Sequence, residues 1–266
     1  MTARSAAALA VVLLLAGCGG GHSTRDALRA YIEKVNAVEL SMRAPLLAVD
    51  RADRHFSTSP VSLPAERPKL VRSQRTLDRL TARLRALDPP APARRLHRLL
   101  VSLAADEAGL AAELVHVATF LPPYRAAVQP LQSVNQQLQQ RLTGKRTSAE
   151  EATALAQYAA DLQPELAALA RLQPPPLFAP SYRTQVATLQ LLRRSALALA
   201  AGLRRHETKR LRAHTAAFSA AARSGASITA QRAQIAAVRG FDARQAALAT
   251  LAMRIERERA RLDKLP

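Results

Sequence analysis

Leucine and alanine recur at helical spacing along most of the chain. The clearest stripe runs through Leu70, Leu77, Leu80, Leu84 and Leu87, with steps of three, four and seven residues. Such steps place apolar side chains on one side of an α-helix. Valine and isoleucine, which favour strands, are scarce by comparison. The pattern therefore predicts an all-α protein, an elongated bundle of six or seven helices.

Prolines mark the joints between these helices, because proline lacks the N–H that the helix ladder needs and restricts the residue before it. The predicted helices span 24–56 with a kink at Pro45, 66–87, 93–121, a polar segment after Pro122 and Pro123 that ends at Leu142, 148–172, 181–224 and 229–265. Ser148, followed three residues later by Glu151, has the form of a capping box that opens the fifth of them.

Part of the pattern recurs with an offset of 85 residues. Leu84, Leu87, Pro89, Pro90 and Val101 return as Leu169, Leu172, Pro174, Pro175 and Val186. The repeat predicts a duplicated unit of helix, proline joint and helix, in which each hairpin buries its apolar stripe against the other. The halves would be residues 24–143 and 147–266, packed as one bundle. Independent leucine stripes that happen to end in prolines are the alternative.

The first residues have the layout of an export signal. Arg4 precedes an apolar run from Ala6 to Ala16, and Gly17 and Cys18 follow. This run has eleven residues, whereas a permanent transmembrane helix needs about 20. Residues 1–17 are therefore predicted to be a cleaved signal peptide.

Leu15, Ala16, Gly17 and Cys18 resemble the lipobox of bacterial lipoproteins. The resemblance implies that Cys18 carries a diacylglyceryl group and that the mature chain is extracytoplasmic, anchored to the cell membrane by its lipid. Residues 18–23, with their three glycines, would form a flexible tether. Cys18 is the only cysteine, so an intramolecular disulfide is excluded. An incidental cysteine in an ordinary signal peptide is the alternative.

The helical part also resembles uncharacterised helical lipoproteins of high-GC Gram-positive bacteria, in which a leucine helix, a double proline and a second leucine helix recur. Here Leu84 and Leu87 precede Pro89 and Pro90, and a second leucine-rich segment follows. This resemblance implies no activity.

The formal charge of +19 falls by one when the predicted leader is removed. Such a charge suits nucleic acid, anionic lipid or an acidic wall polymer, although codon bias of a GC-rich genome would also enrich arginine. The predicted extracytoplasmic address favours the lipid or the polymer. The absence of Trp, with only five Phe and four Tyr, disfavours base stacking. The predicted anionic contacts are Arg204, Arg205, Lys209, Arg210 and Arg212, whereas Arg254–Lys264 has the pattern of a self-paired exposed face.

Residue patterns for catalysis are missing. Glu113 and His116 form one Glu-x-x-His pair, but a di-iron bundle needs two. His206 and His214 lack the spacing of a zinc-protease helix, and the chain contains neither G-x-S-x-G nor a phosphate loop. We therefore expect no enzyme, cofactor or metal.

The leading hypothesis is a membrane-anchored, non-enzymatic lipoprotein of the cell envelope, whose helical surface meets a protein or an anionic envelope polymer. One alternative is extracellular nucleic-acid binding through the Arg-rich helices. Another is a metal-binding bundle centred on Glu113 and His116. The sequence leaves the oligomeric state open.

Overall fold

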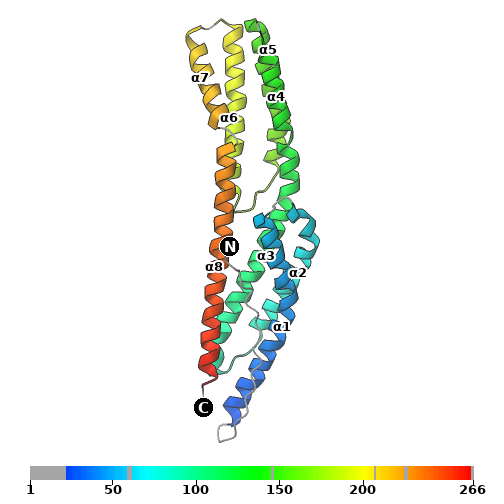
Figure 1. Cartoon of the computed structure of the whole chain (residues 1–266), viewed down its shortest axis with the longest axis vertical. Helices are drawn as coiled ribbons and strands as arrows, with labels where there is room; N and C mark the ends of the chain where they lie inside the picture. Colours follow the sequence, from blue (N-terminus) through cyan, green and yellow to red (C-terminus); the bar gives the residue numbers. More distant parts are fainter. Residues whose placement is uncertain (1–21, 59–61, 145–146, 207, 225–226, 265–266) are drawn as a thin grey trace. The chain divides into compact units, whose positions relative to one another are not determined.

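The computed structural model describes residues 22–58, 62–144, 147–206, 208–224 and 227–264, and these ranges contain helices but no strand. The predicted all-α class is therefore confirmed. The predicted signal peptide, Cys18 and most of the predicted tether lie outside the described residues. The helices are α1 (His22–Thr58), α2 (Leu63–Arg85), a short 3-10 helix (Ala91–Ala93), α3 (Arg94–Val128), α4 (Pro130–Leu142), α5 (Ser148–Ala170), α6 (Ala179–Arg204), α7 (Thr208–Ser224) and α8 (Ser227–Leu262) (Figure 1).

The helices form two compact units. Unit 1 comprises residues 1–55, 68–114 and 245–266, and unit 2 comprises 56–67 and 115–244. This division differs from the predicted halves, 24–143 and 147–266. Its boundaries fall inside helices α1, α2, α3 and α8, each of which contributes residues to both units.

The offset of 85 residues extends from the sequence to the helix bounds. Helices α2 and α5 both have 23 residues, and their first residues, 63 and 148, differ by 85. Helices α3 and α6 begin at Arg94 and Ala179, which again differ by 85. Buried leucines match too: Leu77 and Leu162 are 0% and 1% exposed. These coincidences support the predicted duplication of one unit of helix, proline joint and helix.

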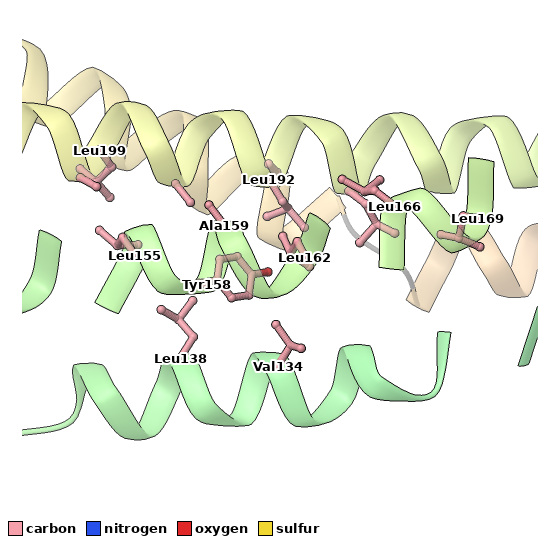
Figure 2. Packing of buried hydrophobic residues seen from close by; sticks show 14 of the residues in the cluster. Val134, Leu138, Leu155, Tyr158, Ala159, Leu162, Leu166, Leu169, Leu192 and Leu199 are labelled. Atoms are coloured by element: carbon pink, nitrogen blue, oxygen red, sulfur yellow. The ribbon is translucent and has the colours of Figure 1, made fainter. Parts of the chain in front are cut away.

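The core of unit 2 lies along α5, with α4 and α6 on either side of it (Figure 2). Its central face is supplied by α5 at steps of three and four residues, which is the spacing of a single helical stripe. Figure 2 labels Val134 and Leu138 of α4, Leu155, Tyr158, Ala159, Leu162, Leu166 and Leu169 of α5, and Leu192 and Leu199 of α6. Full burial of one such side chain contributes about 1.5–3 kcal/mol.

The core of unit 1 is built from leucine, valine and isoleucine side chains of α1, α2, α3 and α8. These side chains are at most 1% exposed: Val35, Val49, Leu70, Leu77, Leu84, Leu96, Leu110, Leu114 and Ile255. The leucine stripe predicted for α2 therefore faces the core, which leaves the opposite side of α2 to solvent.

The break predicted at Pro122 and Pro123 was wrong. Helix α3 continues through both prolines to Val128, and the interruption lies at Gln129, ahead of Pro130. Proline is tolerated at the first position of a helix, where the missing N–H would have no helical partner. Within α3, burial of the neighbouring Phe120, 5% exposed, offsets the lost hydrogen bonds.

The predicted helix 181–224 is interrupted. Helix α6 ends at Arg204, and His206 has a positive φ of 53°, a left-handed conformation that terminates helices. The chain then returns as α7, which packs on α6, and Gly202 of α6 is buried at this contact. A Cβ atom at Gly202 would lie 3.5 Å from side-chain atoms of Leu211 and His214.

The capping box of α5 lies one residue earlier than predicted. Thr147, not Ser148, is the N-cap: its Oγ1 accepts a hydrogen bond from the Glu150 N–H at 3.3 Å, and Glu150 Oε2 accepts one from the Thr147 N–H at 2.8 Å. Thr147 has the extended backbone that an N-cap requires, with φ −80° and ψ 155°.

Thr147→Ala is expected to lower the free energy of unfolding by about 1 kcal/mol, because the Glu150 N–H loses its acceptor, the Thr147 hydroxyl oxygen. Urea unfolding followed by circular dichroism would measure the change. Ser148→Ala is the matched control, since Ser148 is exposed and follows the cap. An equal loss in the two variants would contradict the assignment of Thr147 as the N-cap.

Candidate functional site

The predicted anionic contacts lie at the turn between α6 and α7, not on one continuous helix. Arg204, Arg205, Arg210 and Arg212 are exposed, while the side chain of Lys209 lies outside the described residues. Arg205 and Arg210 already interact with other residues. Because the left-handed residue His206 interrupts the helix, these cations do not form a regular row.

Glu113 and His116 do not belong to a cluster of metal-ligating side chains among the described residues. His116 is exposed, and its Nε2 lies 3.3 Å from the carbonyl oxygen of Gln173. Among the residues that the structure describes, no group of three or more His, Cys, Asp or Glu side chains could hold a metal ion. Nothing in these ranges therefore supports the metal-binding alternative.

An arginine stripe on α2 forms a regular charged surface, which the sequence-based predictions missed. It consists of Arg72, Arg75, Arg79 and Arg83, all exposed. Their steps of three, four and four residues keep them within about 80° of arc on a helix that turns 100° per residue. The stripe lies roughly opposite the buried face of α2, so the fold positions it toward solvent.

Hardly any protein partner competes for the arginine stripe. Within the described ranges, Arg72, Arg75 and Arg83 make no ion pair or side-chain hydrogen bond, and Arg79 donates only to Thr76 Oγ1 at 3.3 Å. Helix α2 holds seven Lys or Arg residues and two acids. The spacing of the stripe is visible in the sequence. Its arginines are less densely spaced than the basic residues of Arg204–Arg212 and Arg254–Lys264, the two segments considered there.

The segment Arg254–Lys264 is self-paired as predicted, through Glu256–Arg259 and Glu258–Arg261, and most of its charged residues are exposed. Arg259 and Glu258 depart from the prediction, because they lie in a largely buried polar network of unit 1. Arg259 is 11% exposed and pairs with Glu39 of α1, which is 17% exposed. Glu256 and Arg259 do pair along α8, at 3.7 Å. Glu258, 5% exposed, lies 2.7 Å from Arg261 and 3.6 Å from Arg95.

Burial sets the electrostatics of this network. It raises the pKa of Glu39, against the opposing effect of the Arg259 guanidinium. Burial likewise raises the pKa of Tyr31, whose hydroxyl is hydrogen-bonded to His97 Nδ1 at 3.1 Å. The polar groups of this network pair with one another inside unit 1, as expected for a network that stabilises the fold.

Acidic side chains meet where α1 and α3 pack in unit 1. Burial, together with the carboxylates of Asp50, Asp106 and Asp53, raises the pKa of Glu107 to about 7. Asp53 is 4% exposed and accepts a hydrogen bond from Gln245 Nε2 at 3.1 Å. The cluster makes Glu107 sensitive to pH near neutrality.

The described aromatic side chains are all buried or half-buried, so none offers an exposed stacking surface. In unit 2, Phe120 stacks on Tyr124 with ring centroids 5.1 Å apart, and Tyr182 meets Phe120 edge-on at 5.8 Å. A hollow of about 80 Å³ between α1 and α8, lined by Ile32 and Leu262 among others, is far smaller than a ligand pocket of about 300 Å³ or more.

One described helix, α6, is long and apolar enough to cross a membrane by length and composition. Core helices meet the same criteria. Leu189, Leu192 and Leu199 of α6 are buried in the core of unit 2.

No family model, curated protein or solved structure matches the chain. The class of the protein therefore rests on its own features: an all-α bundle protein that carries a regular row of exposed arginines.

Proposed function

We propose that the protein is a lipid-anchored, non-enzymatic lipoprotein of the cell envelope, whose helical bundle offers a binding surface to an anionic envelope polymer or to a protein. The lipobox at Leu15–Cys18, with Cys18 as the only cysteine, carries the proposal. Two acyl chains at about 0.8 kcal/mol per buried CH₂ would hold the mature chain firmly at a membrane.

The described residues supply a surface suited to this role. The arginine stripe is solvent-exposed and almost free of partners among the described residues, whereas Arg259 is held inside unit 1 by Glu39. A tethered bundle with such a face would bring its cations to the polyanions of the envelope without any catalytic group.

The test is Cys18→Ala in the native cell, followed by intact mass and detergent partitioning. The wild-type chain is expected to begin at Cys18, to carry diacylglyceryl mass and to enter the detergent phase. The variant should lose both the modification and membrane retention. Gly21→Ala, in the predicted tether, is the matched control and should behave as wild type. An unmodified wild-type Cys18 behind an intact leader would overturn the proposal.

A further inference from the structure

We propose that the arginine stripe of α2 is a docking surface for a linear polyphosphodiester without nucleobases, a chain of the kind found in acidic cell-wall polymers. This inference rests on the proposed function, because it names the envelope polymer that the bundle meets. The four guanidinium groups recur about every 5–6 Å over roughly 16 Å of helix. A flexible phosphate chain can follow such a row.

The chemistry of the stripe fits phosphate. Arginine presents a planar fork of donors that binds phosphate oxygens in pairs, and it remains charged at all physiological pH values. Arg72, Arg75 and Arg83 have these donors unused by the described part of the protein. A phosphate chain would therefore displace no ion pair on binding.

Helix α5 provides an internal comparison, because it matches α2 in length and in its buried leucines at an offset of 85 residues. At the positions that correspond to the stripe, α5 has Gln157, Ala160, Pro164 and Ala168. The fold therefore does not require cations on this side of the helix.

A compositional bias toward arginine would act on both helices alike, yet they differ in charge. Helix α5 contains four acidic residues and no basic one, whereas α2 contains seven basic residues and two acidic ones. Like charges three and four residues apart repel one another, so the stripe opposes helix stability. An external anion explains why the row is present on α2 and absent from α5.

The same face disfavours two other polyanions. A helix that lies on a lipid surface adds large apolar residues beside its cations. The exposed large apolar side chains, Leu40, Leu47, Leu142, Leu191, Leu197 and Met253, all lie outside α2. Single-stranded nucleic acid is bound with aromatic side chains under its bases, and α2 contains no aromatic residue.

The experiment compares the full chain, in nonionic detergent, with two variants of equal charge. The stripe variant carries R72Q, R75Q, R79Q and R83Q. The control variant carries R43Q, R51Q, R254Q and R257Q on α1 and α8, where these arginines are exposed and make no ion pair in the described ranges. Glutamine is a good helix former, so circular dichroism should show an unchanged fold. If the stripe variant fails to fold, R75Q with R79Q replaces it.

The probes are synthetic poly(glycerol phosphate), an oligothymidylate of equal charge, and phosphatidylglycerol-rich vesicles, each titrated with salt. For poly(glycerol phosphate), the stripe variant should lose about 30-fold in affinity at low salt, and its slope of log K against log salt should become less negative by about 3. The control variant should lose less than about threefold.

Equal losses in the two variants would overturn the inference, because only generic charge would then explain binding. It would also be overturned if the stripe variant lost only oligothymidylate binding, or only vesicle binding. None of these results affects Cys18→Ala, so the lipid-anchored lipoprotein can survive the failure of this inference. Conversely, if Cys18 proved to be unmodified, the comparison of the stripe and control variants would still measure whether the stripe binds the polymer.

Discussion

Replacing Arg259 by methionine is expected to lower the free energy of unfolding by about 3–5 kcal/mol. Arg259 of α8 and Glu39 of α1 form a largely buried pair, and methionine removes the cation but leaves the carboxylate inside unit 1. An uncompensated buried charge costs far more than the net contribution of the pair. Because the Arg259 guanidinium opposes the burial that raises the pKa of Glu39, its loss should raise that pKa further.

The loss should therefore be larger at pH 8 than at pH 5, because the raised pKa favours protonation of Glu39, and so loss of its charge, as the pH falls. Urea unfolding at both pH values measures it. Arg257→Met is the matched control: Arg257 is exposed on α8, so its change should stay within about 0.5 kcal/mol. The double variant with Glu39→Gln should recover much of the loss. A loss that is independent of pH and unrelieved in the double variant would contradict the expectation.

Glu107→Gln is expected to stabilise unit 1 above pH 7 and to have little effect below pH 4.5. The pKa of Glu107 is raised from 4.5 to about 7 by burial and by the carboxylates of Asp50, Asp106 and Asp53. The folded state therefore binds the proton more tightly than the unfolded state. Stability falls as pH rises through this window, and above it the folded chain bears the full penalty of a buried carboxylate.

Glutamine removes that penalty, which amounts to about 3 kcal/mol at 1.36 kcal/mol per pKa unit. The measurement is the free energy of unfolding from pH 4 to pH 8 for wild type and variant. Asp263→Asn, an exposed acid near the end of α8, is the control and should run parallel to wild type. A Glu107→Gln curve that also runs parallel would show that Glu107 titrates as an exposed carboxyl.

The sequence predicted the helices and their buried faces because leucine spacing encodes both. Leu70, Leu77 and Leu84 recur every seven residues, and all three are at most 1% exposed. Such a stripe can be read locally, since its only requirement is that one side of a helix be covered.

The joints between helices were harder to predict, because they depend on packing between distant residues. Pro122 and Pro123 are local stop signals, yet the helix passes through them with Phe120 and Tyr124 packed in the core of unit 2. The opposite error occurred at His206, where the chain turns without glycine or proline. Tertiary contacts decide both cases.

The candidate site, too, could be predicted from the sequence only in part. The spacing of Arg72, Arg75 and Arg79 was present in the sequence, but which basic rows lack partners depends on the neighbouring helices. Arg259 lies in a segment just as basic, and it turned out to be buried against Glu39. The sequence shows where cations lie along a helix, whereas the fold determines which of them form ion pairs within the protein.

Helices α2 and α5 show that burial and outward charge are independent properties of one helical register. Buried leucines stand at matching positions of the two helices, such as Leu77 and Leu162. Their net charges are nevertheless opposite, since basic residues outnumber acidic ones in α2 and only acidic ones occur in α5. Substitutions on the outward face of either helix can therefore change the surface charge of the protein while the leucine register that packs the helix stays the same.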